Sequence, residues 1–161
     1  MVTKRGTKKA PKPWALYPSL HEQVTRLLEE DDLFFDFNHA DDDVSCIRDY
    51  DTTIMGHFAC RNASCKSDGW SSKKIAITIR MYPGARYNAR VYFQRCKSCK
   101  KLSRPSLDDS YADRVAYRLK KWCGVHVAQP YRSGQSKGPH QSELCEGCKA
   151  GHCSEMSQAD F

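Results

Sequence analysis

The sequence has few of the residues that build a hydrophobic core, and it has no long hydrophobic run. Leucine, isoleucine, valine and phenylalanine make up 27 of 161 residues, about 17%, and a packed core becomes doubtful below roughly 20%. No apolar stretch approaches the ~20 residues of a membrane-spanning helix. The basic residues 1–5 precede no apolar segment, so we predict no secretory signal and a cytoplasmic or nuclear protein. The fold therefore needs a support other than hydrophobic burial.

Sequence signatures of the common enzyme classes are also missing. There is no glycine-rich phosphate-binding loop, no nucleophile–base pair recognisable as a motif and no His-x-Glu…Pro-Cys-x-x-Cys deaminase signature. We therefore predict a protein that is not an enzyme.

Cysteine, by contrast, is abundant. The chain has nine cysteines, an odd number that a closed set of disulfides cannot accommodate. In a reducing compartment, clustered cysteines are better interpreted as thiolate ligands of a metal ion. We therefore expect Zn²⁺ to be the support that the thin core requires, with two ions expected and one as the minimum.

Two cysteine pairs lie on either side of the clearest hairpin in the sequence. Cys60-x4-Cys65 precedes two runs of alternating apolar and polar residues, 75–81 and 87–93, and Cys96-x2-Cys99 follows them. Pro83-Gly84 separates the runs and predicts a turn. Because the two runs match in length, the hairpin should return Cys96 next to Cys65. The four cysteines therefore predict a tetrahedral zinc site in a zinc ribbon.

A second cluster lies near the end of the chain. His140-x4-Cys145-x2-Cys148-x4-Cys153 offers one imidazole and three thiolates within 14 residues. We favour His140 as the fourth ligand, with His152 or Cys123 as alternatives, and a disordered tail with a single zinc elsewhere as another. Cys46 is expected to be inert, and Cys123 to be a buried thiol at a helix end.

The remaining patterns predict an α+β fold. It consists of a zinc-stabilised antiparallel β-ribbon, two helices that flank the ribbon, and a C-terminal zinc knuckle. Ser19 to Glu22 resembles a capping box and opens a predicted helix over 19–31. Alternating Leu33, Phe35 and Phe37 indicate a short strand. The predicted divisions are a disordered basic arm (1–13), a zinc-binding domain (14–155) and a tail (156–161). The domain contains a ribbon (54–104), a helix (109–122) and the terminal cluster (140–153).

The net charge of +7 is a small difference between two opposed regions. Residues 61–104 carry twelve cations and one acid, whereas residues 29–51 carry ten acids and one arginine. Cations bind phosphate and aromatic rings stack on unpaired bases, so the ribbon is a candidate platform for single-stranded RNA. The residues predicted to contact nucleic acid are Lys73, Arg80, Arg86, Arg90, Tyr92, Arg95, Lys97, Lys100 and Lys101. The alternative is that the acidic segment pairs with the ribbon and neutralises it.

These motifs resemble a known family. Gly56-His57-Phe58-x-Cys60-x4-Cys65, Cys96-Lys97-x-Cys99 and His140-x4-Cys145-Glu146-x-Cys148 are similar to the three-CxxC zinc-finger domain of receptor-transporting proteins, zygote-arrest proteins and fungal stand-alone members. The similarity extends over about residues 15–155 and departs from the pattern at the first pair, which is Cys-x4-Cys. It implies zinc binding through Cys60, Cys65, Cys96 and Cys99 and through His140, Cys145, Cys148 and Cys153.

The resemblance implies two kinds of function. Zygote-arrest members bind messenger RNA, and receptor-transporting members act as trafficking partners of membrane receptors. We therefore predict a zinc-binding module for nucleic acid, RNA above all, with a protein-interaction adaptor as the alternative. The short sequence suggests a fungal-type member without a membrane span.

Overall fold

The computed structural model describes residues 12–60, 62–128 and 141–153. The helices are η1 (Pro18–Leu20), α1 (His21–Glu29), α2 (Ser110–Trp122), η2 (Ser142–Leu144) and α3 (Glu146–Lys149). The strands are β1 (Trp14–Leu16), β2 (Asp36–Phe37), β3 (Arg48–Phe58), β4 (Trp70–Tyr82), β5 (Arg86–Tyr92), β6 (Gln94–Arg95), β7 (Leu102–Ser103) and β8 (Pro105–Leu107). The predicted basic arm falls almost entirely outside the described residues, as does the predicted tail.

The predicted hairpin is the centre of the main sheet. The strand order is β1-β5-β4-β3-β8, and β2 adds to β5 in parallel. β4 and β5 pair antiparallel with Ile77 opposite Val91 and Ile79 opposite Ala89. The chain turns through residues 83–85, where Gly84 adopts a φ of +82° that glycine accepts without strain. The period-two pattern therefore identified both strands and their shared apolar face.

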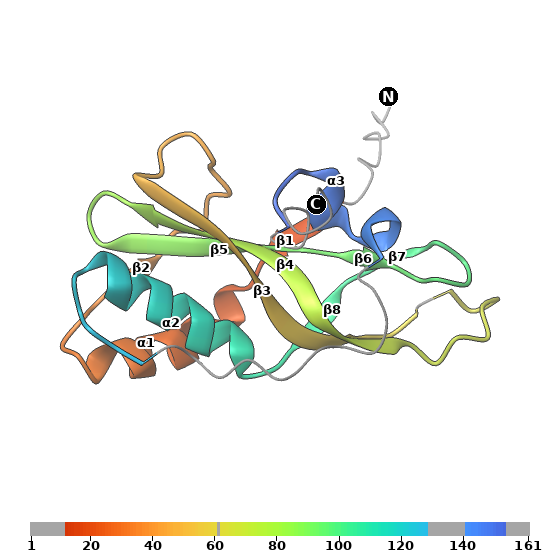
Figure 1. The fold of residues 1–161 in the computed structure, drawn as a ribbon, viewed down its shortest axis with the longest axis horizontal. Coiled ribbons are helices and arrows are strands. Elements are labelled where there is room, and N and C mark those ends of the chain that lie inside the picture. Colours follow the sequence, from red (N-terminus) through yellow and green to blue (C-terminus); the bar gives the residue numbers. More distant parts are fainter. Residues whose placement is uncertain (1–11, 61, 129–140, 154–161) are drawn as a thin grey trace, which may run out of the picture.

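The two long helices cover one face of this sheet (Figure 1). Helix α1 packs on α2, and the apolar sides of both helices meet the isoleucine and valine side chains of β4 and β5. Five fully buried residues are central to this layer: Leu28, Ile77, Val91, Tyr111 and Leu119. This arrangement confirms the α+β prediction of an antiparallel sheet with two flanking helices.

The other face of the sheet is also covered, by the connection between β2 and β3 and by the segment that contains α3 (Figure 1). A smaller buried cluster lies there, formed by Ala76, Tyr92, Cys145 and Cys153. The ribbon is therefore an internal layer, which the charge pattern did not reveal.

Several local predictions need correction. The predicted capping box is a 3-10 turn instead, since α1 begins at His21 and no side chain caps it. Strand β3 begins at Arg48, inside the acidic segment, because its first residues pair with β4 up to Met81. Cys123 lies exposed at the end of α2 and is not the buried thiol we predicted.

Candidate metal centres

Four cysteines from two separate loops converge in the first centre. The Sγ atoms of Cys60, Cys65, Cys96 and Cys99 all lie within 4.8 Å of one another. The Sγ–Sγ distance is 3.6 Å between Cys60 and Cys99 and 3.8 Å between Cys65 and Cys96. A tetrahedral site with Zn–S bonds of about 2.3 Å places its sulfurs about 3.8 Å apart. The cluster therefore has the dimensions of a four-thiolate zinc site, and Cys96 returns to Cys65 as predicted.

Tight backbone turns hold these thiols in position. The N–H of Lys100 donates to the carbonyl of Cys96 (2.8 Å), and the N–H of Cys96 donates to the carbonyl of Lys101 (3.0 Å). On the other loop, Gly69 lies so close to the chain that an added Cβ would be 2.2 Å from the carbonyl oxygen of Phe58. Glycine at position 69 lets the loop that contains Cys60 and Cys65 return directly to the end of β3, the strand that leads into Cys60.

The protein distributes protons unequally over the four thiols. A backbone N–H at Cys99 lowers the pKa of Cys96 to about 6, and one at Lys101 lowers the pKa of Cys99. A backbone N–H at Asn62 acts in the same direction on Cys60, but loss of hydration and the neighbouring thiols together raise the pKa of Cys60 to about 12. A cation that binds all four sulfurs therefore displaces a proton from Cys60, and its affinity rises with pH.

The second centre brings together Cys145, Cys148 and Cys153, whose Sγ atoms also lie within 4.8 Å of one another. Cys145 is at the N-cap of α3, and its Sγ accepts a hydrogen bond from the N–H of Cys148 (3.4 Å). The sheet positions this turn, because Cys145 forms a bridge with Gln94 and the N–H of Glu146 donates to the carbonyl of Phe93.

The described residues supply three ligands to this centre. His140, the favoured fourth ligand, lies outside the described residues. His152 is not in the cluster: its Nδ1 lies 3.1 Å from Oδ2 of Asp51, and its ring stacks on Tyr92. Cys123 is not in the cluster either. His140 remains our prediction for the fourth position.

An ion pair links the two centres. The Nε of Arg95, directly before Cys96, donates to Oε1 of Glu146, directly after Cys145, at 2.6 Å. The carboxylate of Glu146 is nearly buried, and Lys149 lies 3.3 Å from the same oxygen. This ion pair therefore connects the turn between Cys96 and Cys99 of the first site to helix α3 of the second site.

The match to known families agrees with this geometry. The zinc-binding domain of the three-CxxC zinc-ribbon family matches residues 53–151, more than half of the chain. The chain belongs to this family. No curated protein and no solved structure matches it. The clusters of four and three cysteines fit two zinc sites in this three-CxxC zinc ribbon, as predicted.

The sheet buries three of the nine residues that we predicted to contact nucleic acid. Arg80, Arg90 and Tyr92 alternate with the isoleucines and valines and so lie on the opposite face of the hairpin, but they are only 2%, 9% and 0% exposed. The expectation that they form an open platform is therefore wrong, because the β2–β3 connection and α3 cover that face. Arg86 is exposed but lies at the hairpin turn, far along the ribbon from the first zinc site (Figure 1).

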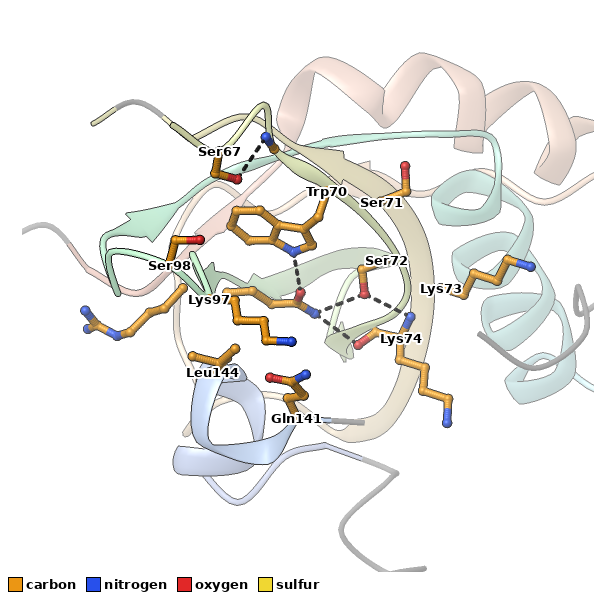
Figure 2. A pocket seen from close by; sticks show the side chains of 13 residues that line it. Ser67, Trp70, Ser71, Ser72, Lys73, Lys74, Lys97, Ser98, Gln141 and Leu144 are labelled. Carbon is orange, nitrogen blue, oxygen red and sulfur yellow. Dashed lines mark hydrogen bonds between the residues drawn. The ribbon is translucent and has the colours of Figure 1, made fainter. Parts of the chain in front are cut away.

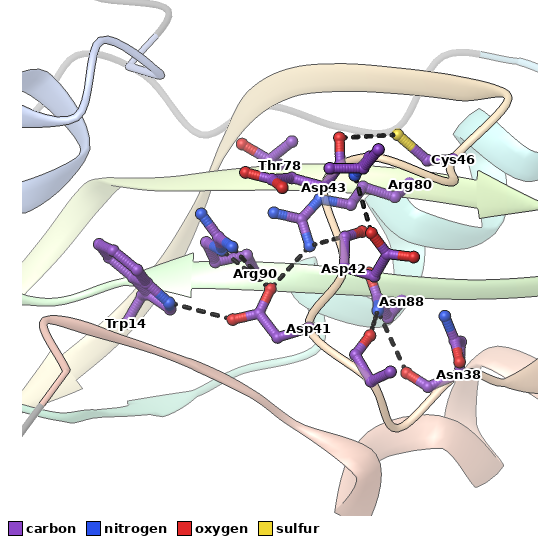
Figure 3. A network of polar contacts seen from close by, with 12 residues as sticks. Trp14, Asn38, Asp41, Asp42, Asp43, Cys46, Thr78, Arg80, Asn88 and Arg90 are labelled. Atoms are coloured by element: carbon purple, nitrogen blue, oxygen red, sulfur yellow. Dashed lines mark hydrogen bonds and ion pairs between the residues drawn. The ribbon is translucent and has the colours of Figure 1, made fainter.

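Asp41 is the residue that neutralises this face. It is one of ten acids in residues 29–51, and nothing in the sequence distinguishes it from the others as a partner of the arginines. Its Oδ1 accepts hydrogen bonds from Nη1 of Arg80 (2.7 Å) and Nη2 of Arg90 (2.8 Å), and its Oδ2 accepts one from the indole of Trp14 (3.0 Å), as Figure 3 shows. Burial by itself would raise the pKa of Asp41, but the hydrogen bonds and charges of the two arginines outweigh it and hold the pKa below its ordinary value.

The remaining predicted residues lie on or next to the first zinc site. Lys97, Lys100 and Lys101 are exposed on the second knuckle, Lys73 is exposed near the start of β4, and Arg95 is half-buried on β6. No helix in the described part of the chain has both the length and the apolar character needed to cross a membrane.

Proposed function

We propose that this three-CxxC zinc ribbon is a non-enzymatic module that binds nucleic acid, single-stranded RNA in particular, in the cytoplasm or nucleus. The contact surface is the zinc-site end of the ribbon rather than its sheet face. Its exposed cations are Lys66, Lys73, Lys97, Lys100 and Lys101. The zinc ions act as structural supports that fix the loops carrying these side chains.

One observation carries this proposal: the acidic segment neutralises the sheet face and leaves the zinc-site end basic. On the sheet face, Asp41 pairs with Arg80 and Arg90. Elsewhere, Asp31 of the same segment pairs with Lys120 on α2 at 2.7 Å. Among the described residues, no acid of the 29–51 segment forms an ion pair with the five exposed lysines. Four thiolates around one Zn²⁺ leave a net negative charge that offsets part of this basic surface, and the lysines remain in excess.

The proposal predicts binding that weakens steeply with salt. For single-stranded nucleic acid, the logarithm of the binding constant falls with the logarithm of the salt concentration by about 0.7 for each phosphate contact. A triple variant, Lys97→Gln, Lys100→Gln and Lys101→Gln, should therefore lower that slope by about 2. Fluorescence anisotropy with a labelled oligoribonucleotide at several salt concentrations measures it.

The matched control is Lys121→Gln, an exposed lysine on α2, which should leave the slope unchanged. Zinc content is determined for every variant so that a loss of metal is recognised. Absent or salt-insensitive binding by the zinc-loaded wild type would overturn the proposal.

A second candidate, a protein-interaction adaptor, is favoured by one other observation. Val44 and Ile47 in the β2–β3 connection are 86% and 58% exposed, and isolated side chains of this kind add apolar area to an otherwise acidic loop. This function predicts a partner that remains bound in a pull-down after nuclease treatment and is lost in Val44→Ser/Ile47→Ser. Loss of all partners upon nuclease treatment would exclude it.

A further inference from the structure

A pocket of about 390 Å³ lies between the two metal centres. Three parts of the chain line it (Figure 2). They are Ser67 with residues 69–74 at the start of β4, residues 94, 95, 97 and 98 from β6 into the turn between Cys96 and Cys99, and Gln141 with Leu144 around η2. Each part leads directly to a cysteine cluster. The pocket therefore takes its shape from both centres, and its volume is within the range of about 300–1,000 Å³ that is typical of small-molecule sites.

The floor of the pocket is rigid. The side-chain amide of Gln94, only 9% exposed, accepts a hydrogen bond from the indole N–H of Trp70 (3.1 Å) and donates to Oγ of Ser72 (3.2 Å) and the carbonyl of Lys74 (3.3 Å). Trp70 is held further by stacking on Phe58, with ring centroids 4.9 Å apart. The aromatic ring and the hydroxyl of Ser72 are thus fixed before any ligand arrives.

The described lining residues carry positive charge and no carboxylate. They include Lys73, Lys74, Arg95 and Lys97, and none of the described residues that line the pocket is an aspartate or a glutamate. Arg95 is engaged with Glu146. Lys97 is exposed and its side chain points into the pocket, whereas the exposed side chain of Lys73 points away from it (Figure 2). Serine hydroxyls, from Ser72 and Ser98 among others, provide further hydrogen-bonding groups. Such a lining fits a ligand with a phosphate group and a flat, partly polar ring.

We propose that this pocket binds one phosphorylated nucleoside unit, with the phosphate at Lys97 and the base against Trp70. Leu144 and Gln141, which Figure 2 shows across the pocket from Trp70, provide an apolar contact and an amide for the base edge. The inference rests on the proposed function, since the unit is then one nucleotide of a bound RNA strand. A free nucleotide has the same chemistry, and the experiment separates the two sources.

The test is a titration of the zinc-loaded full chain with the four ribonucleoside 5′-monophosphates, followed by NMR. The signals to observe are the indole N–H of Trp70 and the side-chain amide of Gln94. Both should shift and saturate. Inorganic phosphate and the unphosphorylated nucleosides should each bind at least about tenfold more weakly, because each makes only part of the contacts. Unmoved pocket signals, or equal binding of inorganic phosphate alone, would overturn the proposal.

Charge-neutralising variants locate the phosphate. Lys97→Gln should weaken monophosphate binding about fivefold or more, while Lys73→Gln, whose side chain points away from the pocket, and Lys121→Gln should not change it. All three side chains are exposed, so the fold should tolerate the changes, and zinc analysis verifies the neighbouring centre. Equal affinity in all three variants would place the phosphate elsewhere and refute the assignment.

An oligoribonucleotide arm separates this inference from the proposed function. If the oligonucleotide binds and shifts the pocket signals, the unit belongs to an RNA strand. If it binds without moving them, the proposed function stands and the pocket assignment is wrong. If only the monophosphates bind, the pocket takes a free nucleotide and the RNA-binding proposal is wrong.

Discussion

Gly147 illustrates how a single residue determines whether the second metal centre can reach the sheet. A Cβ at this position would lie 2.3 Å from the Cβ of Ala76 and 3.5 Å from that of Tyr92. Gly147, which lies between Cys145 and Cys148, is therefore required for packing and does more than separate the two cysteines. It lets α3 lie directly on β4, which holds Cys145 and Cys148 against the sheet.

Gly147→Ala should destabilise the protein by about 1–3 kcal/mol, the usual cost of forcing extra volume into a packed contact. Thermal unfolding with zinc present measures the loss as a lower Tm. The double variant Gly147→Ala/Ala76→Gly removes the opposing methyl group and should recover part of the loss relative to Gly147→Ala. An unchanged Tm in the single variant would show that α3 does not dock as closely as described.

Seven of the nine cysteines lie in the two clusters and two, Cys46 and Cys123, lie outside them; Cys46 can be compared directly with a ligand. Cys99→Ser should remove one zinc equivalent and unfold the ribbon, because structural zinc contributes about 10–16 kcal/mol and a domain has a net stability of only about 5–15 kcal/mol. Cys46→Ser should be almost silent, since this half-buried thiol lies outside both clusters and its hydrogen bond is a long one, to the Asp43 carbonyl at 3.8 Å. Metal analysis and far-UV circular dichroism test both, and full zinc content in Cys99→Ser would contradict the first centre.

At the scale of elements, the β2–β3 connection acts as a cover for the polar face of the hairpin. Asp41 is its anchor, and backbone carbonyls support it: Asn88 Nδ2 donates to the carbonyls of Asn38 (3.1 Å) and Ala40 (2.8 Å). The hydroxyl of Tyr82 donates to the carbonyl of Asp42. The connection is thus tied to both strands of the hairpin, and it supplies the counter-charge of the two arginines that it buries.

Asp41→Asn should cost about 3 kcal/mol, the typical loss when one partner of a buried ion pair is removed. The pKa of Asp41 is lower in the folded state than its ordinary value of 3.8, so its contribution is complete above that value and disappears as the pH falls through the folded pKa. The stability difference between wild type and variant should therefore stay constant from pH ~7 to pH ~5 and shrink only below pH ~4. Urea denaturation measures it, and a difference that already falls near pH ~5.5 would contradict the assignment.

At the scale of the whole molecule, charge is separated along the ribbon rather than mixed. The acids of residues 29–51 lie around the helices, the hairpin face and β3, while five exposed lysines, Lys66, Lys73, Lys97, Lys100 and Lys101, lie around the first zinc site. The Arg95–Glu146 pair and the shared pocket connect both metal centres to that basic end. The metal sites, the pocket and the basic surface therefore lie together at one end of the ribbon.

Removal of zinc should affect all three together. A chelator in excess should abolish the far-UV signal of the ribbon, lower the Tm and eliminate oligoribonucleotide binding in the same concentration range. Metal analysis before chelation should give two zinc ions per chain. Unchanged circular dichroism and melting after complete removal of the metal would refute a structural role for zinc.

The sequence determined the metal chemistry and the central hairpin by itself, because both depend on local order along the chain. Cysteine spacing fixes which sulfurs share a turn, and a period of two fixes which side chains share a face of a strand. From these the four ligands of the first site, the three thiolates of the second and the two strands of the hairpin could all be predicted. The predicted start of the first helix at Ser19 was wrong, because residues 18–20 form a 3-10 turn that competes with a capped helix over a few residues.

Only the tertiary structure decided which of those faces meets solvent. Alternation assigns Arg80, Arg90 and Tyr92 to the polar face of the hairpin but does not show that another segment covers it. That outcome depends on Asp41, which lies 39 and 49 residues before the two arginines and is one of many acids with the same local context. The charge of each residue follows from its type, but neutralisation depends on the distance between opposite charges. Only the folded structure fixes the distance between Asp41 and the two arginines.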